Sequence, residues 1–167
     1  LYPGSEESYT ALQGIESSYV TLNRISDYLA YTKTLGTIIT VPSTNKEDSL
    51  TYMAAEHQFI QGNYKEAAKG LETYVERFCP VGRYCTQASY YLATSYYNID
   101  DKTNALAAYD KLTHIANNPY IEEAYTRCAM LSYDLQQYDS ARVYFQSLQK
   151  IANSTEIIHA ARIGTLR

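Results

Sequence analysis

Small and large apolar residues recur along this chain at helical spacing, and the arrangement is repeated three times. Ala67, Ala105 and Ala141 are 38 and 36 residues apart. Four positions after each of them stands a larger apolar residue: Leu71, Tyr109 and Phe145. Twelve positions before each stands another alanine, itself followed after four positions by an aromatic residue: Ala55 with Phe59, Ala93 with Tyr97, and Ala129 with Tyr133. Since residues i and i+4 share one face of a helix, the pattern predicts three successive helix pairs.

Close packing explains why small residues recur at these places. Two helices approach to about 8–10 Å only where the side chains at their crossing are small and larger neighbours fill the flanking grooves. A single pair leaves one apolar face uncovered, and the next pair buries that face. The sequence therefore predicts an all-α fold made of stacked helix hairpins.

Caps and breakers set the expected helix ends. Thr44 to Glu47 has the pattern of a capping box, Gly62-Asn63 ends the helix that follows, and Pro80 and Pro119 fall in or beside connections between pairs. The β-branched residues and proline of 36–43 predict an extended loop. Helices are predicted at 5–21, 24–35, 46–61, 64–78, 83–98, 101–115, 119–135, 138–152 and 155–166.

The first predicted pair departs from the small-residue rule. Tyr28, 39 residues before Ala67, replaces the second-helix alanine, and Glu16 replaces the first-helix one. The pair is either a divergent repeat or a junction between two arrays, and we favour the divergent repeat. We expect a divergent pair and loop over 1–43, followed over 44–167 by three repeats and the first helix of another. We also expect one continuous solenoid that is part of a longer protein.

The composition of the chain is that of a protein with a hydrophobic core, and its charge limits the kinds of partner. With 46% hydrophobic residues the chain has enough apolar material for a core. Its net charge of -4 argues against nucleic-acid or anionic-membrane partners, because both require clustered Lys and Arg. No apolar run approaches the roughly 18 residues of a membrane span. No targeting peptide is visible in the sequence.

Motifs for catalysis, cofactors or metals are missing from the sequence. It contains no Gly-rich phosphate loop, no Gly-x-Ser-x-Gly elbow and no His-Glu-x-x-His. Cys79 and Cys85 do not form a zinc set with the distant His57, His114 and His159. We expect no enzyme activity, no cofactor and no metal.

The three cysteines carry separate expectations. Cys79 and Cys85 flank the connection around Pro80 and are close enough to form a disulfide if the loop curls; the alternative is two free thiols near helix ends. Cys128, beside Ala129 on a packing face, is expected to be an inert core residue.

Several short motifs resemble the tetratricopeptide-repeat family. Leu92-Ala93-x-x-Tyr96 is similar to its first-helix element, and Ala105-x-x-x-Tyr109 and Ala141-x-x-x-Phe145 are similar to its second-helix element. The resemblance covers 44–167 clearly and 5–35 weakly, and the Trp typical of the family is absent. It implies a right-handed superhelical solenoid that acts as a scaffold for a protein or peptide. Alternatives are a peptide-sensing regulatory module and an accessory domain of a larger protein.

A narrower resemblance concerns Phe78-Cys79-Pro80 and the aromatic segment 88–97. These segments are similar to envelope members of the family in Gram-negative bacteria, namely outer-membrane assembly lipoproteins and Tol-Pal-associated periplasmic proteins. That resemblance implies a periplasmic or envelope location.

The first helix of each pair is expected to line the concave surface of such a stack. Nine residues are predicted to project there: Tyr52, Glu56, Phe59, Tyr90, Thr94, Tyr97, Thr126, Met130 and Tyr133. They form a candidate surface for an extended peptide or a helix, and the alternative is that several rings pack between repeats. The Asn and Lys/Arg clamp by which chaperone adaptors hold a C-terminal carboxylate is absent at these positions.

Overall fold

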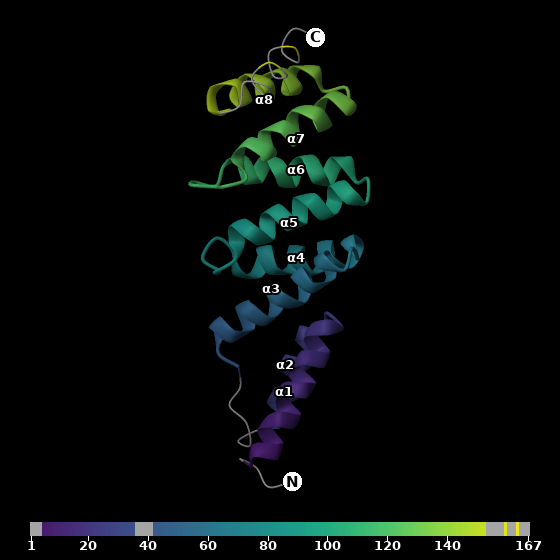
Figure 1. The fold of residues 1–167 in the computed structure, drawn as a ribbon, viewed down its shortest axis with the longest axis vertical. Helices are drawn as coiled ribbons and strands as arrows, with labels where there is room; N and C mark the ends of the chain where they lie inside the picture. The colour runs from purple at the N-terminus through teal and green to yellow at the C-terminus, as the bar shows by residue number, and fades with distance from the viewer. Residues whose placement is uncertain (1–4, 36–41, 153–158, 160–162, 164–167) are drawn as a thin grey trace. The chain divides into compact units, whose positions relative to one another are not determined.

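Eight α-helices and no strand make up the part of the chain that the computed structural model describes, residues 5–35, 42–152, 159 and 163 (Figure 1). The helices are α1 (Glu6–Thr21), α2 (Ile25–Thr34), α3 (Thr44–Ile60), α4 (Tyr64–Phe78), α5 (Cys85–Asn98), α6 (Lys102–Thr113), α7 (Ile121–Asp134) and α8 (Tyr138–Ile151). The all-α class is confirmed, and no helix end differs from its predicted position by more than two residues. The predicted helix 155–166 and most of the 36–43 loop lie outside the described residues.

The same turn joins the two helices of every pair. One residue in each turn has a positive φ: Asn23 (54°), Gly62 (76°), Asp100 (59°) and Gln136 (59°). The next amide in each turn donates to the carbonyl five residues earlier: Arg24 to Tyr19, Asn63 to Gln58, Asp101 to Tyr96 and Gln137 to Ser132. This hydrogen bond and the left-handed residue are those of a Schellman turn. The turn between α1 and α2 is therefore of the same kind as those of the three later pairs.

One helix start differs from the predicted capping box. Ser43 caps α3, with its hydroxyl accepting a hydrogen bond from the Lys46 amide (3.3 Å). With Ser43 as the N-cap, the third residue of the helix is Lys46, so Glu47 does not stand at the capping-box position; its carboxylate forms an ion pair with Arg77 of α4. The cap therefore lies one residue before the predicted Thr44.

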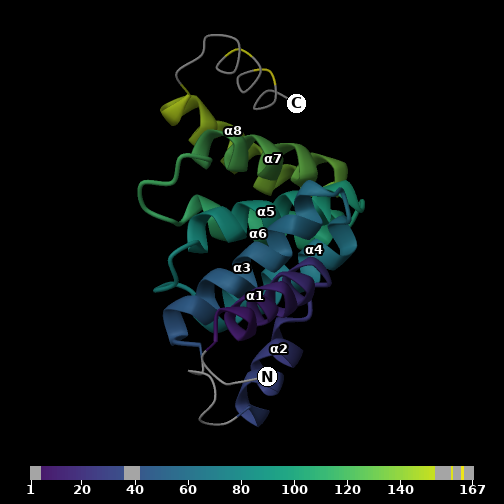
Figure 2. The ribbon, with the colours of Figure 1, turned by 60° about the horizontal axis from the view of Figure 1, so that its bottom comes forward.

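The chain divides into two compact units, residues 1–91 and 92–167, with the division inside α5. In the first unit, α3 and α4 form an antiparallel hairpin in which Ala55 and Ala67 are fully buried. α1 and α2 both contact α3 (Figure 2). None of the residues of α1 is fully buried. A hydrophobic cluster formed by α2 and α3 comprises Ile25, Tyr28, Leu29, Leu50 and Ala54.

The departure at Tyr28 and Glu16 has a physical explanation. Where the other pairs place two alanines, Tyr28 donates a hydrogen bond to the Glu16 carboxylate (2.7 Å). The tyrosine is 4% exposed, and Lys46 forms an ion pair with the same carboxylate (2.6 Å). A hydrogen-bonded pair thus takes the place of the small-residue contact.

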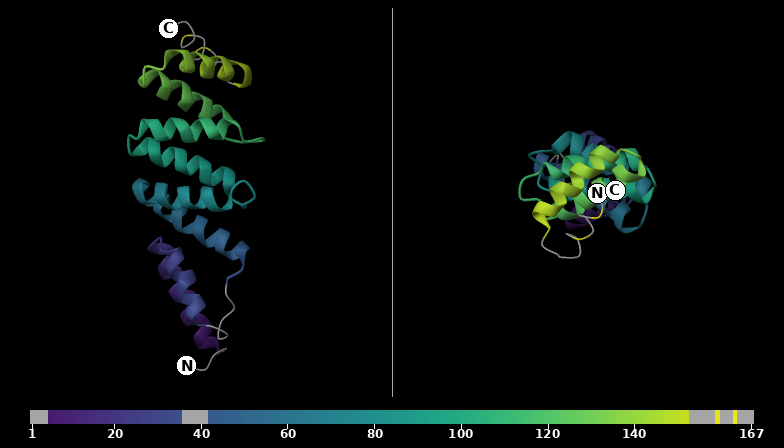
Figure 3. Two further views of the ribbon diagram at one scale, coloured as in Figure 1. Left: turned by 180° about the vertical axis from the view of Figure 1, so that it is seen from behind. Right: turned by 90° about the horizontal axis from the view of Figure 1, so that it is seen from above.

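The second unit contains the end of α5 and the helices α6, α7 and α8, of which α7 and α8 form an antiparallel hairpin (Figure 3). The four alanines of the repeated pattern that fall in this unit, which we call register alanines, are all buried: Ala93, Ala105, Ala129 and Ala141. Tyr109, Leu112 and Leu148 fill the space around them and are also buried. Alanines at the crossings and large residues one turn away thus share the core, as the pattern predicts.

Candidate functional site

The predicted binding residues of the first unit are used mainly for packing. Tyr52 is 4% exposed, and its ring stacks on Tyr84 with centroids 4.3 Å apart. Its hydroxyl donates to Glu56 (2.7 Å). The expectation that Tyr52 projects from the surface is therefore wrong, because its ring fills the space between α3 and the residue before α5.

Phe59 and Tyr90 are half-buried. Phe59 stacks on Tyr91 with centroids 4.2 Å apart and meets Tyr64 edge to face. Tyr90 lies beside Tyr91, with centroids 5.9 Å apart. The Phe59 ring thus packs between α3 and α5, which is the alternative that the sequence left open, while for Tyr90 both possibilities stay open.

Two predicted residues of the second unit make internal hydrogen bonds. The hydroxyl of Thr94 lies 3.1 Å from that of Tyr109, and Thr126 donates to the carbonyl of Glu122 in its own helix (2.8 Å). Both threonines are half-buried. Each hydroxyl thus already makes one hydrogen bond within the unit.

The remaining three predicted residues lie on the surface of the second unit. Tyr97 is 40% exposed, Met130 52% and Tyr133 44%. Arg127, which the sequence reading missed, lies over the Tyr97 ring with its guanidinium carbon 4.4 Å from the centroid. Arg127, Met130 and Tyr133 follow one another at intervals of three along α7, and that spacing was the available signal. Together with Tyr97 they are called the α7 patch.

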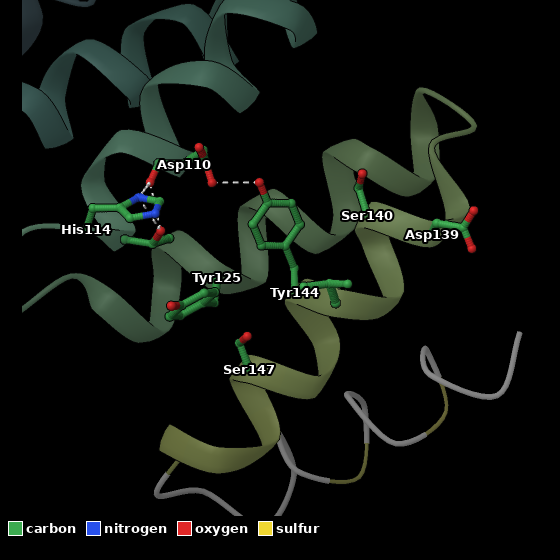
Figure 4. A pocket seen from close by; sticks show the side chains of 9 residues that line it. Asp110, His114, Tyr125, Asp139, Ser140, Tyr144 and Ser147 are labelled. Carbon is green, nitrogen blue, oxygen red and sulfur yellow. Dashed lines mark hydrogen bonds between the residues drawn. The ribbon is translucent and has the colours of Figure 1, made fainter.

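A hollow lies between α6 and α8, with a volume of about 450 Å³, and is called the α6–α8 cleft. Figure 4 shows Asp110 of α6, His114 directly after it, Tyr125 of α7, and Asp139, Tyr144 and Ser147 of α8 around it. No sequence motif pointed to this cleft, because its residues come from three helices without common spacing.

The acidic side of the α6–α8 cleft is held in place by hydrogen bonds. Tyr144 donates to the Asp110 carboxylate (2.7 Å), and His114 Nδ1 lies 2.8 Å from the Asp110 carbonyl. Burial, and then this hydrogen bond to Asp110, raises the pKa of Tyr144 above its ordinary value. Tyr144 is therefore neutral at physiological pH and keeps donating to the carboxylate.

Cys79 and Cys85 form a disulfide, with their Cα atoms 5.5 Å apart. Cys128 is buried, and that burial raises the pKa of its thiol to about 12. A thiol of this kind is a poor nucleophile at neutral pH. Across the described ranges, no group of three or more His, Cys, Asp or Glu residues is placed to hold a metal ion.

Comparison with protein families finds one whose description is tetratricopeptide repeat, and its profile matches residues 40–163. A search of curated proteins finds no match. None of the described helices is long and apolar enough to cross a membrane.

Proposed function

Because the chain belongs to the tetratricopeptide-repeat family, whose repeats generally mediate contacts between proteins, we propose that it is a non-enzymatic scaffold for a protein or peptide. The binding surface in this proposal is the α7 patch, whose residues all belong to the second unit. The patch is the single observation that carries the proposal.

The α7 patch has the chemistry of a protein-binding surface. Met130 adapts its shape to an apolar partner, and Tyr97 and Tyr133 offer large rings with polar tips. Arg127 is held by the Tyr97 ring and by Glu123 (3.5 Å), so its position is set before a partner arrives. Aromatic residues, Met and Arg are enriched at protein interfaces.

Removing the patch tests this proposal. A chain with Met130→Ala and Tyr133→Ala is compared with the unchanged chain in affinity capture, and captured proteins are then purified and titrated directly. The control is Tyr9→Ala, a tyrosine 59% exposed on α1. We expect the patch variant to weaken binding by about tenfold or more while the control leaves it unchanged. Equal binding by all three chains, each with unchanged melting, would refute the patch as the site.

The setting we propose is the bacterial periplasm or cell envelope. The Cys79–Cys85 disulfide supports it, because such bonds persist in oxidising compartments and are rare in the cytosol. Labelling of free thiols in unfolded protein from freshly quenched cells tests the setting. We expect labelling of Cys128 alone, and labelling of all three cysteines would contradict the proposal.

A further inference from the structure

Residues 79–85, which comprise the connection between α4 and α5 and the first residue of α5, form a loop that we call the disulfide loop. Hydrogen bonds to buried groups of α3 and α4 fix its backbone. The Cys79–Cys85 bond closes it. Three of its backbone amides donate hydrogen bonds to groups of α3 and α4. Gly82 donates to the carbonyl of Phe78 (2.7 Å), Arg83 to the carboxylate of Asp48 (2.9 Å) and Tyr84 to the hydroxyl of Tyr74 (3.0 Å). A Cβ atom at Gly82 would lie 2.8 Å from that of Phe78, so only glycine fits there. The loop therefore has its shape before any partner binds.

The disulfide loop presents an aliphatic side chain and a cation to solvent. Val81, at its tip, is 93% exposed, the most exposed of the large hydrophobic residues described. Arg83 is also exposed and forms no ion pair with any described residue, although its guanidinium lies over the Tyr84 ring (5.6 Å). Because the backbone is already ordered, binding through these two side chains would cost little conformational entropy.

The α6–α8 cleft has the complementary chemistry. Asp110 and Asp139 supply negative charge, while Val143, 57% exposed, and the Tyr125 ring supply apolar surface. The side chain of Asp139 is fully exposed at 103%, and its nearest cation, Arg142, is 3.9 Å away. Its carboxylate is therefore accessible to a cation from another molecule.

We propose that the disulfide loop of one copy of this chain docks in the α6–α8 cleft of a second copy. Arg83 pairs with the carboxylate of Asp139, and Val81 packs against Val143 and Tyr125. The loop lies in the first compact unit and the cleft in the second, so each surface is complete within one unit. Because the two surfaces differ, the contact is heterologous, and repeated contacts lead to a ring or to an open chain of copies.

Sedimentation velocity over a series of protein concentrations at low ionic strength tests this contact. Single variants Arg83→Asp and Asp139→Arg each place like charges at the contact. We expect each to weaken self-association by about tenfold or more. In a mixture, the unaltered Arg83 of the Asp139→Arg chain meets the unaltered Asp139 of the Arg83→Asp chain, and the new carboxylate meets the new cation. Association between the two variants should therefore return to within about threefold of the unchanged chain. Lys65→Asp, an exposed site on α4 with the same charge change, is the control.

Two results would overturn the proposal. One is a monomer at every concentration of the unchanged chain. The other is association that Arg83→Asp and Asp139→Arg leave unaltered, which would assign it to another surface. A loop that instead serves a different protein would give the first result. None of these variants touches Met130 or Tyr133, so binding by the α7 patch is tested separately.

Discussion

Two connections between successive helix pairs occupy corresponding places and are held by different means. After α4, residues 79–84 are held by a disulfide, a buried carboxylate and a buried tyrosine. After α6, residues 114–120 are held to α6 by side chains of the connection itself. Asn118 donates to the carbonyl of Leu112 (2.8 Å) and accepts from the amide of Tyr120 (2.9 Å), and His114 Nδ1 lies 2.8 Å from the Asp110 carbonyl. Both connections bury polar groups and satisfy them, but only the first recruits residues from two helices.

The difference begins at a single core position. Tyr74 in α4 corresponds to Leu112 in α6, 38 residues later, and both are fully buried. The leucine needs no polar partner, whereas the tyrosine hydroxyl does. Asp48 of α3 accepts from that hydroxyl, which in turn accepts from the Tyr84 amide. One hydroxyl in the core thus links the loop to both helices of its hairpin.

The largest expected effect comes from Asp48→Ala. It leaves the Tyr74 hydroxyl and the Arg83 amide without their acceptor in a buried setting, and we expect a loss of about 3 kcal/mol in unfolding free energy. Urea unfolding measures the loss, and hydrogen exchange should show faster exchange over 79–85 than over 114–120. Asp48→Asn keeps one acceptor and should lose about half as much. Equal exchange in both connections would refute the role given to Asp48.

Replacing both Cys79 and Cys85 with Ser ranks next. The bond closes a loop with a sequence separation of 6, which is shorter than the 15 residues for which about 3 kcal/mol is expected, so we predict a loss of about 2 kcal/mol. Unfolding of the oxidised chain and the double variant measures it. Because the hydrogen bonds to Asp48 and Tyr74 remain, the amides of 83 and 84 should stay protected. Complete loss of their protection would show that the disulfide alone orders the loop.

Asn118→Ala tests the other connection, and the expected loss is about 1–2 kcal/mol. Two hydrogen bonds disappear, but both join neutral groups, and such bonds contribute less than those made to the Asp48 carboxylate. Asn118→Asp is the matched control, since it can accept from Tyr120 but cannot donate to Leu112 when ionised. A loss as large as that of Asp48→Ala would remove the contrast between the connections.

Helix spacing made most of the fold predictable, because the register alanines report directly on helix crossings. The same spacing also identified Glu16 and Tyr28 as the residues that replace the two alanines in the first pair, although it did not predict the hydrogen bond between them. The surface was harder to predict. Tyr52 and Met130 are both first-helix residues predicted to project from it, yet one is buried and the other exposed. What buries Tyr52 is the ring of Tyr84, which the disulfide loop brings to it, and the helical period carries no information on that contact.

The α6–α8 cleft could not be predicted from the sequence for a similar reason. Asp110 and Tyr144 are 34 residues apart, and the hydrogen bond between them depends on how α6 and α8 lie against α7. Polar residues on solvated helix faces are common, so neither one stood out. Their significance arises only from the hollow that they share.

The smallest expected effect is a loss of stability at alkaline pH, and only the connection after α4 should contribute to it. Burial, and then the hydrogen bond to Asp48, raises the pKa of Tyr74 above the value of about 10 that it has in the unfolded chain. The unfolded state therefore releases this proton first, so the stability contribution is complete below pH 10 and is lost as the pH rises above it. At pH 10 the loss from this one group is about 0.4 kcal/mol. Asn118 does not titrate, and its connection gains no such dependence.

Comparison with the Tyr74→Phe variant isolates the part of the alkaline stability loss that comes from the Tyr74 hydroxyl. Tyr28, Tyr109 and Tyr144 also have raised pKa values and add their own alkaline losses, so the unfolding free energy of the unchanged chain must be compared with that of a variant. Between pH 8 and pH 10 the unchanged chain should lose about 0.4 kcal/mol more than Tyr74→Phe, and the same as Asn118→Ala. Absorbance at 295 nm should show these four of the 19 tyrosines ionising only as the chain unfolds. If Tyr74→Phe and the unchanged chain lose stability in parallel, the Tyr74 hydroxyl is not the titrating link of the disulfide loop.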